Sequence, residues 1–107
     1  MVADLVAEAE LTPAVRALAD PLRARIVELL ATEQLCVCHL TEELAVAQPL
    51  VSHHLKVLRE AGLVESDRWR YWTYYRLRPD ALLTLADRLE RLAASAPTDT
   101  CERRPCC

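Results

Sequence analysis

Apolar residues recur at helical spacing over most of the chain. Asp20 followed by Pro21 places a capping carboxylate before a proline, a combination typical of helix starts. Thr12 followed by Pro13 gives the same signal, and a start near Asp4 also fits the apolar pattern. The pattern therefore predicts two consecutive helices at the beginning of the chain.

Two more helices are predicted in the middle of the chain, joined by a tight turn. A short helix carries Leu40 and Leu44, and after residues 46–48 Pro49 opens a longer helix. We expect the longer helix to stop at Gly62, the single glycine, because glycine adopts the left-handed conformation that ends helices at little cost. This order predicts a helix-turn-helix unit.

A β-hairpin and a last helix follow this unit. Residues 63–66 and 72–77 read as strands around an arginine-bearing tip at 67–71. Pro79 opens the last helix, whose apolar stripe suits a subunit interface and consists of Leu82, Leu85, Ala86, Leu89, Leu92 and Ala93. We expect a mainly α fold with a small β-hairpin, a homodimeric winged helix-turn-helix over residues 1–95, and a flexible tail over residues 96–107.

Length and cysteine usage narrow the class of protein. A chain of 107 residues that is 52% hydrophobic supports one core. We expect it to stay in the cytoplasm, because no apolar run approaches the roughly 20 residues of a membrane helix and the first residues do not form an export signal. Five cysteines, clustered in two places, favour reduced thiols over a disulfide framework.

The net charge of −3 hides an uneven distribution. Residues 1–47 are strongly acidic, whereas residues 48–78 carry the basic side chains Lys56, Arg59, Arg68, Arg70, Arg76 and Arg78 against Glu60, Glu65 and Asp67. Positive charge therefore gathers where a helix-turn-helix and a hairpin would meet a phosphate backbone.

The second helix of this unit is predicted to enter the major groove of DNA. Gln48, Ser52 and His53 can hydrogen-bond to base edges. The expected phosphate contacts are Lys56, Arg59, Arg68 and Arg70. His54 is a further candidate, although its position toward the apolar side equally fits a hydrogen-bonded core histidine.

The segment Gln48-Pro49-Leu50-Val51-Ser52-His53-His54-Leu55-Lys56-Val57-Leu58-Arg59-Glu60-Ala61-Gly62-Leu63-Val64 resembles the recognition-helix segment of the ArsR/SmtB metal-responsive repressors. Residues 18–23 and 72–77 resemble the early helix junction and the second wing strand of that family, so the resemblance covers roughly residues 12–94. It implies a winged-helix homodimer that binds an imperfect palindrome and represses metal-resistance genes. Ala47 and Leu50 depart from the capping serine and small polar residue common in the family.

Cys36 and Cys38 form a thiol pair at the start of the first helix of the unit. Side chains two residues apart in a helix point away from each other, so both sulfurs can hold one ion only if this segment is non-helical or its first turn opens. Two thiolates favour the soft ions As(III), Sb(III), Cd(II) and Pb(II) over Zn(II), Ni(II) and Co(II). His39 is adjacent and could be a ligand, although we expect it to be a helix-start residue that faces solvent.

Residues 35–40 resemble the metal-binding box of the arsenic and cadmium/lead repressors, in which aspartate commonly stands at the position of His39. Thr41 stands where arsenic-type members often have another cysteine, which leaves a three-thiolate site one ligand short. The tail cysteines Cys101, Cys106 and Cys107 can supply it. This reasoning predicts As(III) or Sb(III) as the inducer, with Cd(II) or Pb(II) as the alternative.

Other classes of function remain as alternatives. A repressor that senses oxidants through a thiol disulfide would use the same DNA-binding part. A protein-protein adaptor could use the winged fold without DNA. A thiol enzyme, such as an arsenate reductase or oxidoreductase, is disfavoured because the sequence has no C-x-x-C pair and no glycine-rich phosphate loop. We therefore expect a repressor and not an enzyme.

Overall fold

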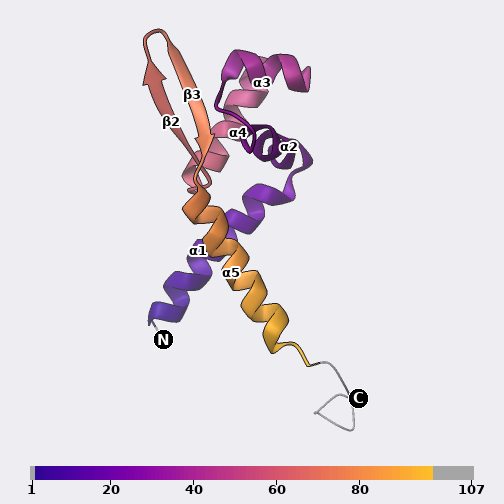
Figure 1. Ribbon diagram of the computed structural model, residues 1–107, viewed down its shortest axis with the longest axis vertical. Coiled ribbons are helices and arrows are strands. Elements are labelled where there is room, and N and C mark those ends of the chain that lie inside the picture. Colours follow the sequence, from indigo (N-terminus) through magenta and orange to yellow (C-terminus); the bar gives the residue numbers. More distant parts are fainter. Residues whose placement is uncertain (1, 98–107) are drawn as a thin grey trace.

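The structure, a computed structural model, describes residues 2–97, with side chains described from Leu11 onward. Five helices and a three-stranded sheet follow one another along this part of the chain (Figure 1). Their bounds are α1 Val2–Ala19, α2 Pro21–Leu30, β1 Leu35–Cys36, α3 Val37–Leu44, α4 Gln48–Glu60, β2 Val64–Trp69, β3 Trp72–Leu77 and α5 Pro79–Ser95. The mainly α fold with a hairpin is confirmed.

The first two helices show which local signals decide a helix start. Asp20 caps α2, because its Oδ1 accepts hydrogen bonds from the backbone N–H groups of Leu22 at 2.8 Å and Arg23 at 3.1 Å. The bond from Arg23, and after it that from Leu22, holds the pKa of the Asp20 carboxyl below its usual range. Of the two starts considered for the first helix, the one near Asp4 is confirmed and the one at Thr12 is wrong, because α1 runs from Val2 through Pro13.

The sheet is larger than the sequence indicates. β1 pairs antiparallel with β3, with Leu35 opposite Tyr75 and Cys36 opposite Tyr74. β2 pairs with the other edge of β3, up to Trp69 opposite Trp72. The hairpin turn is therefore the two residues 70–71, shorter than the expected tip at 67–71. A strand of two residues has no periodicity to detect, which is why β1 was not predicted.

The core lies where α4 meets the other helices and the sheet. Helix α4 contacts α1, α2, α3 and β2. The largest fully buried side chains are Ile26, Leu40, Val51, Leu55, Leu58, Leu63 and Val64. Gly62, at φ +79°, follows the end of α4 as expected. Burial of one side of α4 therefore fixes which side remains exposed.

His54 belongs to the buried side of α4, which corrects its assignment to the DNA-contacting face. Its exposed fraction is 7%, and its Nδ1 lies 3.1 Å from Nη1 of Arg23. Arginine has no acceptor, so Arg23 donates and His54 accepts as a neutral imidazole. Arg23 also donates from Nε to the carbonyl oxygen of Ala17 at 2.8 Å, and so joins the end of α1 to α4.

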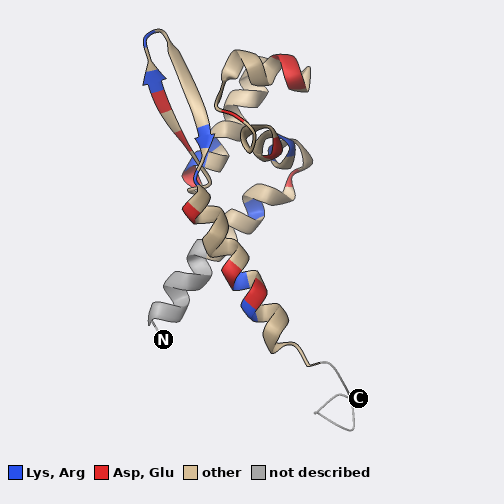
Figure 2. Ribbon diagram, in the orientation of Figure 1, with Lys and Arg blue, Asp and Glu red and all other residues tan. Residues whose placement is uncertain are grey.

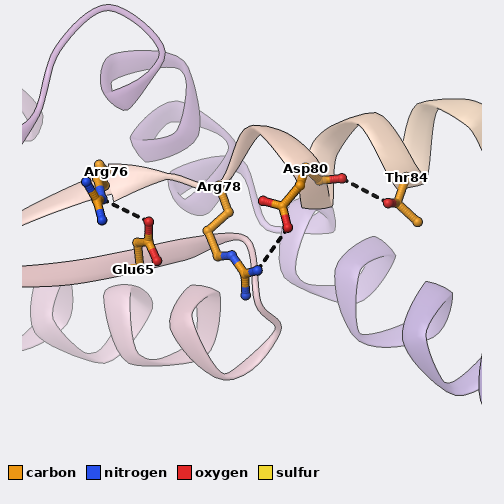
Figure 3. A network of polar contacts seen from close by, with 5 residues as sticks. All are labelled: Glu65, Arg76, Arg78, Asp80 and Thr84. Carbon is orange, nitrogen blue, oxygen red and sulfur yellow. Dashed lines mark hydrogen bonds and ion pairs between the residues drawn. The ribbon is translucent and has the colours of Figure 1, made fainter.

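Helix α5 leaves the body of the molecule after its first turns. Figure 3 shows the junction with the sheet, where Arg78 pairs with Asp80 at 2.9 Å and Thr84 donates to the backbone oxygen of Asp80. Ala81, Leu82 and Leu85 pack against the core. Leu83, Leu89 and Leu92 are exposed in the single chain. Within the described residues, no helix combines the length and apolarity that crossing a membrane requires.

The burial pattern of α4 predicts a stability difference between two leucines of the same helix. Leu55→Ala removes a side chain that is 1% exposed, and we expect it to lower the free energy of unfolding by about 2–5 kcal/mol. Leu50→Ala, where the leucine is 43% exposed, is the matched control and should cost less than about 1 kcal/mol. Urea unfolding at one fixed protein concentration measures both; equal losses would contradict the packing described.

The environment of His54 predicts a pH dependence of stability. Burial lowers the pKa of His54 below 6.5, the charges of Arg23 and His53 act in the same direction, and Asp20 opposes them. As the pH falls below about 6.5, the unfolded chain takes up a proton that the folded chain refuses, so stability falls until the folded pKa is passed. His54→Gln should flatten this decline in urea unfolding between about pH 7.5 and 5.5. The control His53→Gln removes only the smallest of these influences and should keep most of the wild-type slope, whereas a wild-type slope in His54→Gln would refute the assignment.

Candidate nucleic-acid interface and metal centre

The exposed side of α4 is polar and basic. With Val51, His54, Leu55 and Leu58 turned to the core, helical periodicity leaves the opposite side to solvent. The residues that this side exposes are Gln48, Ser52, His53, Lys56 and Arg59, as the sequence predicted. Ala47 provides no side-chain cap to α4, and Pro49 lies in its first turn. The arrangement offers hydrogen-bonding groups in the middle of the face and cations toward its end.

The hairpin extends from the body beside this helix and ends in arginines (Figure 1; Figure 2 shows basic residues at and near its tip). Arg68 and Arg70 are both exposed. Arg70 adopts a left-handed conformation, φ 57°, in the two-residue turn, and its guanidinium carbon lies 4.8 Å from the ring centroid of Trp69. Trp69 in turn stacks on Trp72. The aromatic pair therefore supports a basic side chain at the tip.

Two of the basic residues counted in this region are already paired. Arg76 Nε lies 2.8 Å from the carboxylate of Glu65, and Arg78 pairs with Asp80 (Figure 3). Among the residues whose side chains are described, Lys56, Arg59, Arg68 and Arg70 form no ion pair. These four cations are the predicted phosphate contacts, and they remain available to an external anion.

The thiol pair lies at the junction of the sheet and α3. Cys36 is the last residue of β1 and the N-cap of α3, with extended backbone at φ −90° and ψ 170°. Cys38 lies in the first turn of α3, and the two Sγ atoms are 2.6 Å apart. The sulfurs converge because Cys36 is non-helical. Of the two arrangements that would let both sulfurs face one ion, a non-helical segment and an opened first turn, the structure shows the first, since the extended N-cap turns one sulfur toward the other.

The two thiols differ in acidity. Burial raises the pKa of Cys36, but hydrogen bonds from the Cys38 thiol and from backbone N–H groups at the start of α3 outweigh it, so the pKa of Cys36 lies below 9.0. The pKa of Cys38 is raised, first because its S–H bonds to the Cys36 sulfur and then by burial and the Cys36 charge. The negative charge of a singly ionised pair is therefore favoured on Cys36.

His39 lies closer to the thiols than the sequence indicated. It is exposed, as expected, but its Nδ1 is 3.2 Å from Sγ of Cys36 and accepts a hydrogen bond from the Cys36 backbone N–H at 3.4 Å. The third position of a helix commonly folds back onto the N-cap, and that spacing was the signal that could have placed His39 here. Cys101, Cys106 and Cys107, the other predicted ligands, lie outside the described residues.

The donor chemistry of this junction fits a thiophilic ion. A zinc-like ion with bonds of about 2.3 Å holds two sulfurs about 3.8 Å apart in a tetrahedral site. The Cys36 and Cys38 sulfurs are 2.6 Å apart and would have to separate by roughly 1 Å. Cys38 is exposed and can supply this movement, whereas Cys36 is buried. Two thiolates can thus meet one ion without rearrangement of the core.

Comparison with known proteins places this architecture in a family. The family profile described as "Bacterial regulatory protein, arsR family" matches residues 20–66, which run from the cap of α2 into β2. The chain is 49% identical over 73 residues to the arsenic resistance transcriptional regulator ArsR1 of Pseudomonas putida, a match that covers 65% of this chain. It covers 57% of that relative, so the chain spans little more than half the length of the curated protein.

Two solved structures show the same fold. An ArsR-like transcriptional regulator from Rhodococcus sp. RHA1 has a TM-score of 0.76 at 32% identity, with 81% of this chain and 82% of that chain covered. A homodimeric winged helix-turn-helix DNA-binding domain from Mycobacterium bovis has a TM-score of 0.67 at 25% identity, with 94% and 91% covered. These relatives are described as regulators and not as enzymes, in agreement with the sequence-based expectation. The fold is a winged helix-turn-helix, and the chain belongs to the arsR family of bacterial regulatory proteins.

Proposed function

We propose that the chain is a DNA-binding transcriptional repressor that binds a palindromic operator as a homodimer and leaves it when its thiols capture a soft metal or metalloid ion. The exposed face of α4 carries the proposal. It presents Gln48, Ser52 and His53 on a helix whose opposite side is anchored in the core, with the unpaired cations Lys56 and Arg59 beside them. Such a helix fits the major groove, while Arg68 and Arg70 of the hairpin reach neighbouring phosphates. A bacterial regulator of transcription would act in the cytoplasm, which is the proposed location.

Homodimerisation is supported by α5. Beyond Leu85 the apolar stripe of this helix is exposed in the described chain, where Leu89 and Leu92 are 52% and 63% exposed. Exposed leucines in a continuous helical row favour pairing with another apolar surface, and a second copy provides an identical one. The M. bovis relative is described as homodimeric. Two copies of α4 would then read half-sites about 34 Å apart.

As(III) or Sb(III) is the proposed inducer. Arsenous acid condenses with three thiols to give a trithiolate and three water molecules, so a full site needs Cys36, Cys38 and one more sulfur. Cys101, Cys106 and Cys107 are the candidate third ligands. The name of the P. putida relative, an arsenic resistance regulator, supports this choice of ion and a role in arsenical resistance. Cd(II) and Pb(II) are the alternative inducers, because they share the preference for thiolates.

The position of the two thiols supports a mechanism by which ion binding changes the affinity for DNA. Cys36 pairs with Tyr74 of β3, the inner strand of the hairpin, and Cys38 begins the helix that packs on α4. The exposed Cys38 side chain can move to admit the ion, and the bound ion would then tie the first turn of α3, and through it α4, to β1 and the hairpin. A difference in ion affinity of about 1–3 kcal/mol between the DNA-binding and released conformations is a typical coupling, and it corresponds to about 5–150-fold in operator affinity.

The proposed phosphate contacts predict the salt dependence of DNA binding. Lys56→Ala and Arg68→Ala should each weaken binding to promoter DNA and reduce the slope of log K against log salt by about 2, since each substitution removes one phosphate contact from each of the two subunits. Fluorescence anisotropy at several salt concentrations measures the slope. Arg91→Ala, which removes an exposed arginine paired with Asp87 on α5, is the control and should leave the slope unchanged. Salt-independent wild-type binding, or no binding to promoter DNA, would point to the adaptor alternative.

The thiol pair predicts the response to arsenite. The double variant Cys36→Ser/Cys38→Ser should bind promoter DNA like the wild type, yet stay bound when arsenite releases the wild type. The control is Thr41→Ser in the same helix, which keeps the hydroxyl that bonds to the carbonyl oxygen of Val37 and should release normally. Anisotropy of labelled DNA during arsenite titration distinguishes them. Wild-type release of the double variant would refute the mechanism, and release by peroxide without metal would favour the thiol-redox repressor.

A further inference from the structure

A third donor atom stands beside the two sulfurs on the same short segment of chain. The Sγ atoms of Cys36 and Cys38 and a ring nitrogen of His39 all lie within 4.8 Å of one another. We propose that His39 is a metal ligand, and that Cys36, Cys38 and His39 form a two-thiolate, one-imidazole site for a divalent cation of the Zn(II) or Cd(II) type that is complete without the tail. This inference deepens the proposed function, since it concerns the ligands of the same thiol pair.

The distances place the imidazole in coordination range. Bonds of about 2.3 Å to sulfur and 2.0–2.1 Å to nitrogen put a thiolate and an imidazole about 3.6 Å apart in a tetrahedral site. Nδ1 of His39 is 3.2 Å from Sγ of Cys36, so this pair needs to open by only a few tenths of an ångström. The larger adjustment falls on Cys38. Its side chain and that of His39 are both exposed, so they can move without disturbing packed neighbours.

One of the three ligands has a fixed position, and the other two can move toward a bound ion. Cys36 is buried and lies in β1 opposite Tyr74, so its sulfur has a fixed position. Cys38 and His39 lie in the first turn of α3 and reach back toward it. An entering cation needs two side-chain adjustments, and it has access from solvent on the side of the two exposed ligands. A fourth position stays open to water, as in sites with three protein ligands.

The donor set separates two classes of ion. A divalent cation displaces one proton from each thiol and takes the lone pair of neutral Nδ1, so the bound unit carries no net charge at its first three ligands. Imidazole suits borderline ions such as Zn(II), and thiolates bind both Zn(II) and the softer Cd(II). As(III) condenses with thiols and gains little from an imidazole nitrogen. The affinity for divalent ions should therefore depend on His39. The affinity for arsenite should depend on a third thiolate, supplied by one of the tail cysteines.

Helix capping is the competing explanation for the position of His39. Its Nδ1 accepts from the backbone N–H of Cys36, but at 3.4 Å this hydrogen bond is long compared with the usual 2.9–3.0 Å. A ligand role and a capping role can be distinguished by His39→Gln. Glutamine keeps an acceptor at the third helical position, where it serves a capping box well, but it offers soft cations a poor ligand.

The test uses the full-length, reduced protein without DNA. Cd(II) is titrated while thiolate-to-metal absorption is followed, and competition with a chelator gives the affinity. We expect His39→Gln to lose at least about tenfold in Cd(II) affinity, since even loss of a residue that only supports a ligand costs that much. The matched control His53→Gln removes an exposed histidine of α4, and Cys101→Ser/Cys106→Ser/Cys107→Ser removes the tail thiols. Both should bind Cd(II) like the wild type.

A second readout identifies the ligand atom directly. On addition of Zn(II), the imidazole ¹⁵N resonances of His39 should shift, with Nδ1 affected most, while those of His53 should not. Cd(II) binding by His39→Gln at wild-type affinity, or unshifted His39 nitrogens in the Zn(II)-loaded protein, would overturn the proposal. So would loss of Cd(II) binding in the tail variant.

The arsenite response separates this inference from the function on which it builds. In the promoter anisotropy assay, His39→Gln should be released by arsenite at the wild-type concentration, and the tail variant should need more. Failure of arsenite to release any variant would refute the proposed inducer, while the Cd(II) and Zn(II) titrations, which contain no DNA, would still decide the role of His39. Equal weakening of arsenite and Cd(II) responses in His39→Gln would contradict the separation into two ion classes.

Discussion

The burial of one side of α4 is the constraint on which the other features of this protein depend. Val51, Leu55 and Leu58 are fully enclosed by the other helices and the sheet. Because a helix has 3.6 residues per turn, fixing these positions also fixes the direction of every other side chain on α4. The polar and basic face is therefore held at a defined angle by apolar packing, and the groups that would contact DNA need no structure of their own to be oriented.

The second organising feature is the double role of Cys36, which ends a strand and caps a helix. As part of β1 it is hydrogen-bonded to the hairpin, and as the N-cap it directs its sulfur at the backbone N–H groups of α3. These N–H groups and the Cys38 thiol stabilise the thiolate, so the pKa of Cys36 falls despite its burial. One residue thus combines a fixed position with the chemistry of a ligand, at the junction of β1 and α3.

Long periodic segments were predictable from sequence, and short or tertiary features were not. The exposed residues of α4 follow from the spacing of Val51, Leu55 and Leu58, and the Asp20 cap follows from local chemistry. Strand β1 could not be predicted from the sequence, because two residues show no alternation of polar and apolar side chains. Its pairing, of Leu35 with Tyr75, also joins positions 40 residues apart. The sequence left open whether Cys36 is non-helical or the first turn of the helix opens, and it could not decide between them because the extended backbone of Cys36 belongs to that strand. The burial of His54 was an open alternative that its contact with Arg23 resolves.

The stacked tip of the hairpin affects the thermodynamics of association. A flexible arginine loses rotational freedom when it binds a phosphate, and this loss subtracts from affinity. Arg70 is held by a two-residue turn and by the Trp69 ring beneath its guanidinium, and Trp69 rests on Trp72. Much of this loss of rotational freedom of the Arg70 side chain therefore occurs when the chain folds, before any phosphate is bound. The hairpin consequently presents a preorganised cation, and more of its electrostatic attraction remains as binding free energy.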